Sequence, residues 1–220
     1  MIPSNPKIYH IVHKDRLLSI LQDGYLLSDA VIRQKNTALP MIGMQDIKDR
    51  RLTKSLNRYS DLTVGQCVPF YFCPRSIMLY LIHQRNLNLQ YQNGQDNIIH
   101  LQADFYQVIN WANTQSPKVR WVFTTSNAGS NYFEDYNQLS DLNKINWNAV
   151  NAKYWSDPYI KEGKQAEFLI EQKFPIHLIE QIGVYNQSVY GEVRQIIQNF
   201  NHQMQTNIQI QTNICPDWYY

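Results

Sequence analysis

The chain has 220 residues, of which 44% are hydrophobic and 17% charged, a composition typical of a globular protein with many uncharged polar side chains. This length suits one domain over residues 1–220, which we expect to bury roughly 70% of its unfolded surface without disulfides or metals. The formal net charge of +2 is too small to predict a polyanionic partner by itself.

Cysteine usage and hydropathy indicate a cytoplasmic protein. Cys67, Cys73 and Cys215 are odd in number, and no two of them have the spacing of two to four residues that is typical of metal ligands. We therefore expect reduced thiols. The N-terminal residues have no apolar stretch of signal-peptide length, and no run of about 18 apolar residues occurs, so neither secretion nor a membrane is indicated.

The first third of the chain alternates strand and helix patterns. Residues 7–13, "KIYHIVH", are typical of a short strand that carries two histidines, and residues 14–24 have helical spacing that ends at Gly24. Residues 36–44, "NTALPMIGM", are expected to be a loop. Residues 45–60, "QDIKDRRLTKSLNRYS", have helical spacing with five basic side chains, so we expect a basic helix.

The middle third contains short elements and one turn signal. The patterns predict, in order, a strand at residues 68–72, a helix at 76–86, a strand pair within 86–104, a helix at 104–113 and a strand at 119–126. The strand pair is expected because Asn93-Gly94 is a strong hairpin turn dipeptide.

The last third begins with a long connection, residues 127–164, that is rich in polar and aromatic side chains. A connection of this length is usually functional or disordered, and its aromatic content favours an ordered binding loop with some helix. Strands are then expected at residues 166–174, 179–186 and 208–214, with a helix at 191–200. The mixture predicts an α+β fold with a largely antiparallel sheet.

Common catalytic signatures are absent from the sequence. It contains no glycine-rich phosphate loop, no HExxH, no Cys/His zinc spacing and no G-x-S-x-G elbow. Common nucleotide-binding and hydrolase chemistries are therefore not indicated, and single side chains have to be weighed instead.

Glu167 is the first candidate, at the start of the apolar run in "KQAEFLI". Gln165 lies one strand period earlier, so both side chains are expected on one face. Glu167 could be a charge at a strand end. It could instead hydrogen-bond a sugar hydroxyl and stabilise an oxocarbenium-like centre, as carboxylates do in glycosyl transfer.

The basic and imidazole candidates also have two interpretations. His13 ends the first strand and is either a structural histidine or a ligand-binding one, with His10 the weaker candidate. Arg50 and Arg51 could lie on a solvated helix face. One of them could instead bind a diphosphate, because a guanidinium can donate two parallel hydrogen bonds to a phosphate group. Arg75, taken alone, is more typical of a surface residue.

Several blocks in one order carry a family resemblance. From about residue 6 to 200, "YHIVHKDRLLSILQDGYLLS", "IGMQDIKDRRL", "VPFYFCPRSIMLY", "VFTTSNA" and "NAKYWSDP" followed by "QAEFL" resemble DarT, a family of bacterial DNA ADP-ribosyltransferase toxins. The resemblance implies the ADP-ribosyltransferase-like fold, with a split, mostly antiparallel β core flanked by helices and NAD in the cleft. It also implies that NAD is the cosubstrate, that no metal is needed, and that single-stranded DNA and a DarG-type macrodomain antitoxin are partners.

The resemblance further implies roles for individual residues. Arg51 and Glu167 match the catalytic pair. The segment before Arg51 matches a loop and helix that fold over NAD. The implied NAD-binding residues are His13, Gly43, Met44, Arg51, Arg75 and Met78. The implied substrate-binding residues are Gln165, Trp147, Tyr154 and Trp155. Some family members have a histidine near Asn127, so the preferred base could differ in this chain.

The expected reaction transfers ADP-ribose from NAD to a base in single-stranded DNA and releases nicotinamide, with thymidine as the base of the best-described branch. Aromatic and amide side chains in residues 131–160 suit stacking on unpaired bases, although Trp147 and Trp155 could equally be packing residues. Guanosine, RNA or protein acceptors remain alternatives, as does a binding module without catalysis. Either Arg51 or Glu167 could take the proton of the acceptor base.

Overall fold

The structure, a computed structural model, describes residues 1–35 and 41–220. The predicted loop at residues 36–44 therefore lies partly outside the described residues. The main sheet has eight strands in the order β10-β9-β4-β1-β3-β7-β5-β6, and β2 pairs with β8 in a second, small sheet. The strands are β1 (Lys7–His13), β2 (Tyr25–Leu27), β3 (Cys67–Tyr71), β4 (Ile98–Asp104), β5 (Trp121–Thr124), β6 (Asp135–Tyr136), β7 (Glu167–Glu171), β8 (Lys173–Pro175), β9 (Ile179–Val184) and β10 (Gln211–Ile214).

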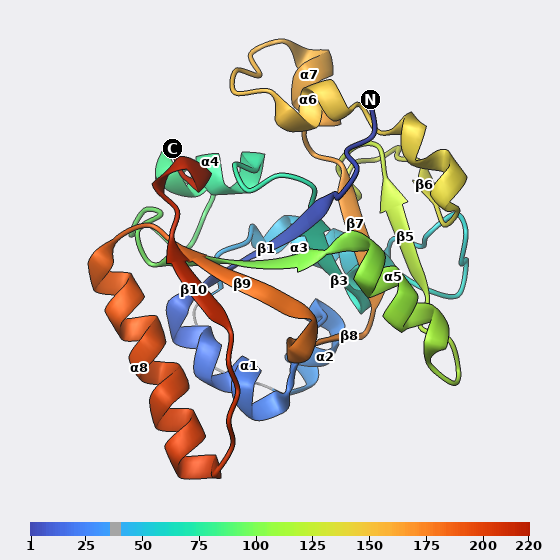
Figure 1. Ribbon diagram of the computed structural model, residues 1–220. Coiled ribbons are helices and arrows are strands. Elements are labelled where there is room, and N and C mark those ends of the chain that lie inside the picture. The colour runs from blue at the N-terminus through green and yellow to red at the C-terminus, as the bar shows by residue number, and fades with distance from the viewer. Residues whose placement is uncertain (36–40) are drawn as a thin grey trace.

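Helices surround the sheet (Figure 1). They are α1 (Leu17–Asp23), α2 (Asp29–Lys35), α3 (Gln45–Thr53), α4 (Ile77–His83), α5 (Phe105–Thr114), α6 (Trp147–Asn151), α7 (Pro158–Gly163) and α8 (Gln187–Met204). Helix α8 packs along α1 on one side, whereas α6 and α7 lie together at the opposite end of the molecule. Among the described strands only β9 and β10 pair in parallel, so the predicted α+β class with a mostly antiparallel sheet is confirmed.

Local sequence patterns predicted where most helices and strands lie, but not which strands pair with each other. Gly24 ends α1 with a φ of 71°, as its position predicts. Gly94 has a φ of 76° and the chain bends at Asn93, but the hydrogen-bonded turn in this region runs from Gln95 to Ile98. The predicted strand pair around Asn93-Gly94 is wrong, because residues 86–97 form no strand and β4 pairs with β1 and β9 instead. The long connection at residues 127–164 is ordered and contains α6 and α7, as expected.

The predicted lengths of two helices are wrong. The basic helix ends at Thr53, because Lys54 is extended and Ser55 forms a bridge with Thr63. The last helix runs from Gln187 to Met204 and is longer than predicted. Helix α2 and strand β2 were not predicted at all. In the described part of the chain, no helix is long and apolar enough to cross a membrane.

A buried histidine anchors the middle of the sheet. His100, in β4, has no exposed surface, and its ring meets the rings of Tyr9, Trp218 and Tyr219 edge-on. Its Nε2–H donates to the carbonyl of Pro74 at 2.9 Å, since a carbonyl only accepts. Burial lowers the pKa of His100 to about 4, although the hydrogen bond to Pro74 acts in the opposite direction. The ring is therefore neutral in the folded protein near pH 7.

We predict that His100 makes the fold sensitive to acid. Its folded-state pKa lies below the ordinary value of 6.5, so its stabilising contribution is complete above about pH 6.5 and is lost as the pH falls toward 4. The loss amounts to about 3 kcal/mol. Urea unfolding between pH 7 and 4 should show a shallower loss of stability in His100→Gln than in the wild type.

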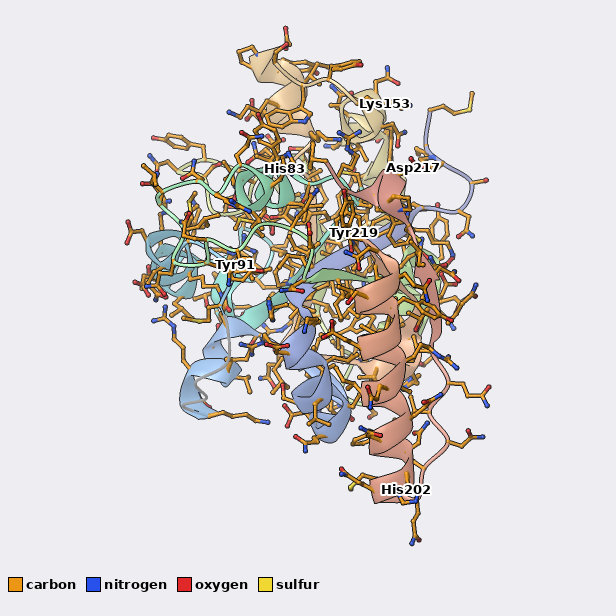
Figure 2. All side chains as sticks on the ribbon, turned by 90° about the vertical axis from the view of Figure 1, so that its left-hand side faces the viewer. His83, Tyr91, Lys153, His202, Asp217 and Tyr219 are labelled. Carbon is orange, nitrogen blue, oxygen red and sulfur yellow. The ribbon has the colours of Figure 1, made fainter. Side chains whose placement is uncertain are left out.

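His202→Gln serves as the control, because His202 is exposed near the end of α8 (Figure 2). This variant should keep the wild-type pH dependence. Identical pH dependence in His100→Gln and the wild type would show that His100 does not carry the effect.

Candidate active site

A cleft lies where the two halves of the sheet part. In the described residues, β1 and β3 are registered at one pair, Tyr9 and Tyr71. Pro69 lacks an N–H for pairing, and its carbonyl accepts a hydrogen bond from Nδ1 of His10 at 2.8 Å instead. A side chain thus replaces part of the backbone pairing, and a cavity of about 260 Å³ opens beside it.

The cavity has an apolar wall and a charged wall. Its lining comes from β1, β2, α2, the residues that precede α3, α3 itself, β3 and α4, together with Arg16, Asn127 and Gln165. The apolar lining side chains include Ile11, Ile32, Ile47, Ile77, Met78 and Leu81. The charged lining residues are Arg16, Asp29, Lys48 and Arg51. Such a surface can hold a ligand with both flat rings and anionic groups.

Arg51 and Glu167 form a buried ion pair at the inner end of this cavity. Arg51 Nη1 donates to Glu167 Oε1 at 3.1 Å, and Nη2 donates to Oε2 at 2.8 Å. The backbone N–H of Ala128 donates to Oε1 at 3.0 Å. Glu167 is only 2% exposed and Arg51 is 9% exposed. Arg51 is among the residues that line the cavity and Glu167 is not.

Backbone contacts place the two partners. The N–H of Glu167, the first residue of β7, donates to Oγ1 of Thr124 in the neighbouring β5 at 3.0 Å. Helix α3 can approach the sheet because residue 65 is glycine. A Cβ at Gly65 would lie 2.8 Å from the Cα of Leu52, the residue next to Arg51. Any side chain at position 65 would therefore push α3, and Arg51 with it, away.

The pair also sets the charge of its neighbours. Burial acts to lower the pKa of Arg51, but the charge and hydrogen bonds of Glu167 outweigh it, and the pKa is raised. The guanidinium therefore stays charged. Tyr71 lies opposite Glu167 in the pairing of β3 and β7, and burial together with the carboxylate raises the pKa of its phenol. Tyr71 is consequently a neutral side chain on the cavity wall.

Gln165 lines the cavity next to this pair. Its Oε1 accepts from Nδ2 of Asn127 at 3.2 Å, and its Nε2 donates to the carbonyl of Lys161 in α7 at 3.1 Å. Oδ1 of Asn127 accepts from the N–H of Gly129 at 2.7 Å. The two amides are therefore held in fixed orientations, and they connect the cavity to α7.

Five of the predicted residues come together at the cavity: Gly43, Met44, Arg51, Met78 and Gln165. His13 and Arg75 are not among the lining residues. His13 accepts from the N–H of Asp15 at 3.3 Å and packs against Tyr91. The guanidinium of Arg75 lies over the ring of Tyr220, 4.4 Å from its centroid.

The three predicted aromatic substrate residues lie outside the cavity lining and differ in exposure. Trp147 is 5% exposed, donates to the carbonyl of Leu142 and packs on Phe72, so the packing interpretation applies to it and its indole is not accessible to a base. Trp155 is half-buried against Tyr80. Tyr154 is 90% exposed.

Sequence analysis did not identify several of the charged and polar residues that line the cavity. It favoured His13 over His10, yet His10 lines the cavity. Burial lowers the pKa of His10, and because Nδ1 donates to Pro69, the neutral ring leaves Nε2 as an acceptor. Asp29 lies on the unpredicted helix α2, and Lys48 appeared only as one of several basic residues. In the described chain no three His, Cys, Asp or Glu side chains gather as a metal would require.

Comparisons with known proteins identify the family. The family model described as "ssDNA thymidine ADP-ribosyltransferase, DarT" matches residues 9–220. A DNA ADP-ribosyl transferase of Thermus sp. (strain 2.9) is 36% identical over 219 residues, which cover 99% of this chain and 98% of the relative.

Solved structures give the same result. Thermus sp. 2.9 DarT in complex with ADP-ribosylated ssDNA has a TM-score of 0.88 at 35% identity, covering 100% of this chain and 99% of that one. The same Thermus protein with NAD+ has a TM-score of 0.81 at 33% identity, covering 100% of both chains. Thermosipho africanus DarTG in complex with ADP-ribose, at 20% identity, shares the fold (TM-score 0.76) over 98% of this chain and 51% of its own.

We predict strong thermodynamic coupling within the buried ion pair. Arg51→Met leaves the carboxylate of Glu167 buried without its partner charge, and Glu167→Gln does the same to the guanidinium of Arg51. Each variant should lower the free energy of unfolding by about 3–5 kcal/mol. The double variant removes both charges and should lose clearly less than the sum of the single losses. Urea unfolding of all four proteins measures this coupling.

Arg50→Met is the matched control, because Arg50 is exposed on the same helix. It should change stability by no more than about 0.5 kcal/mol. Additive losses in the double variant would mean that the two side chains do not depend on each other.

Proposed function

Since the chain belongs to the DarT family of single-stranded-DNA thymidine ADP-ribosyltransferases, we propose that Arg51 and Glu167 are the catalytic pair with which it modifies thymidine. The bidentate contact between them, at the inner end of a cavity with an apolar and a cationic wall, carries the proposal. The enzyme uses NAD as cosubstrate, and the cavity offers what such a dinucleotide needs: apolar side chains for its rings and cations for its diphosphate.

The carboxylate of Glu167 stabilises positive charge at the reacting ribose. NAD supplies ADP-ribose, whose bond to nicotinamide breaks with oxocarbenium character, and a fixed carboxylate can hydrogen-bond a ribose hydroxyl and offset that charge. Arg51 and the N–H of Ala128 hold both carboxylate oxygens.

Proton removal from the acceptor falls to Glu167 in this proposal. The N3–H of thymine is an imide whose proton must leave as the base attacks. Arg51 has a raised pKa and remains a charged donor with no lone pair to accept a proton. The carboxylate is the member of the pair that can accept one.

The acceptor strand is proposed to approach past Gln165 and the connection of α6 to α7. Gln165 and Asn127 are fixed amides on the cavity wall, and α7 receives a hydrogen bond from Gln165 through the carbonyl of Lys161. Nearby, Tyr154 is exposed and Lys161 lies over the ring of Trp155 at 5.8 Å. Exposed aromatics beside cations suit stacking on unpaired bases, and a base must be unstacked to react.

The cellular setting is proposed in line with the family. The chain would form one ADP-ribosyltransferase domain over residues 1–220 and act as a toxin whose partner is a DarG-type macrodomain antitoxin. The thiols of Cys67, Cys73 and Cys215 are free, which supports a cytoplasmic location.

The decisive experiment is mass spectrometry of oligonucleotides incubated with the protein and NAD. Single strands that contain thymidine should gain one ADP-ribose with the wild type and with Arg50→Met. Glu167→Gln should slow the reaction about a hundredfold or more, because it removes charge stabilisation from the transition state.

Strands with guanosine but no thymidine, an RNA strand and a test protein form the comparison arms. Modification of one of these in place of the thymidine strand would contradict the proposed acceptor. A wild-type rate in Glu167→Gln would contradict the proposed role of Glu167.

We also predict that Tyr154 contributes to DNA binding and not to NAD chemistry. Loss of base stacking should raise the KM for the oligonucleotide about 5- to 100-fold in Tyr154→Ala. Hydrolysis of NAD without DNA should be unchanged. The control is Tyr106→Ala, on α5, whose ring is partly exposed on an element that does not line the cavity. Equal effects of the two variants on the oligonucleotide KM would remove Tyr154 from the binding surface.

A further inference from the structure

The cavity offers the diphosphate of NAD cationic partners besides Arg51. One N–H on each terminal nitrogen of Arg51 donates to Glu167, so this edge of the guanidinium faces the carboxylate. The remaining cationic side chains among the lining residues are Arg16 and Lys48. Resting on the proposed function, we infer that Lys48, with Arg16, binds the NAD diphosphate, which leaves Arg51 to act together with Glu167.

Lys48 is held at the cavity by an ion pair. Its Nζ donates to Oδ1 of Asp29 at 2.6 Å, so the contact joins α3 to α2. Both side chains are about one-fifth exposed, at 22% each. Because both side chains keep contact with solvent, water can hydrogen-bond to Asp29 when the ammonium turns to a phosphate oxygen.

Gly43 gives the side chain of Lys48 its path. A Cβ at Gly43 would lie 2.7 Å from Cε of Lys48, so the lysine side chain passes directly over the glycine. The φ of Gly43 is not in the left-handed region, so alanine fits the backbone there. Alanine would therefore displace the end of Lys48 and not the loop. Room for the side chain of Lys48 is thus a physical reason for glycine at position 43, which the family resemblance singled out.

Arg16 belongs to the same charge cluster. Burial lowers its pKa, whereas the charge of Asp29 raises it. Arg16, Asp29 and Lys48 line the same cavity as His10, and Lys48 is hydrogen-bonded to Asp29. Two cations and one acid leave a net positive charge there. Lysine supplies a mobile point charge and arginine a planar fork, a combination that suits neighbouring phosphates.

A second ion pair joins the same two helices and provides an internal control. Arg33 of α2 pairs with Asp49 of α3, and neither residue lines the cavity. Loss of Arg33 therefore tests the connection between the helices without changing the cavity. Loss of Lys48 tests both together.

The test measures KM and kcat for NAD, and the Kd for ADP-ribose by calorimetry, in full-length Lys48→Met, Lys48→Arg, Gly43→Ala and Arg33→Met. We expect Lys48→Met to raise both KM and Kd about 10- to 100-fold, as for the loss of a charge-assisted hydrogen bond, with kcat within about twofold. Lys48→Arg should restore most of the affinity. Gly43→Ala should give a smaller rise in the same direction, and Arg33→Met should match the wild type.

Three results would overturn the inference. Unchanged affinity in Lys48→Met would exclude a phosphate contact, and equal losses in Lys48→Met and Arg33→Met would reduce the effect to the connection between the helices. In both cases the wild type would still bind ADP-ribose and consume NAD, so the proposed function would stand. A wild type that neither bound ADP-ribose nor consumed NAD would overturn the proposed function and this inference with it.

Discussion

The buried ion pair of Arg51 and Glu167 is the constraint on which the rest of the site depends. Neither charge is tolerated at this depth without the other, because removing water from an unpaired ion costs several kcal/mol. Arg51 comes from α3 and Glu167 from β7, 116 residues further along the chain. Formation of the pair therefore fixes α3 on the sheet, and Gly65 makes the required approach possible by the absence of a side chain. One contact therefore positions both the carboxylate that we propose to be catalytic and the helix that lines the cavity.

The split of the sheet determines where a ligand can enter. A continuous antiparallel pairing of β1 and β3 would have closed the space that the cavity occupies. Pro69 interrupts it because proline donates no hydrogen bond, and His10 bridges the gap with its ring. The same side chain thus holds the two halves together and presents an acceptor to the cavity. His10 therefore contributes both to the sheet and to the surface of the cavity.

The connection of α6 and α7 is attached to β7 by a buried lysine. Lys164 is 3% exposed and donates to the carbonyls of Val150 and Ala152, at 3.1 and 2.8 Å. These carbonyls lie at the end of α6, where helix carbonyls lack partners within the helix and where the dipole favours a cation. Lys164 directly precedes Gln165, so the aromatic side chains of the connection are held near the amide of the cavity wall. A rigid link of this kind suits the proposed role of this surface in placing a base at the cavity.

The sequence by itself determined what depends on neighbours along the chain. Each of these features is a local pattern that can be recognised in the sequence: the glycines at positions 24 and 94, the apolar run after Glu167 and the order of the family motifs. The family resemblance also singled out Arg51, Glu167 and Gln165. Tertiary structure decided what depends on distant partners. His10 and His13 lie three residues apart on one strand and so point to opposite faces, but only the pairing of that strand determines which face borders the cavity. The strand after Asn93-Gly94 likewise takes its partners from β1 and β9, and Arg51 meets Glu167 only once α3 packs on the sheet, because none of these contacts is encoded within a single segment.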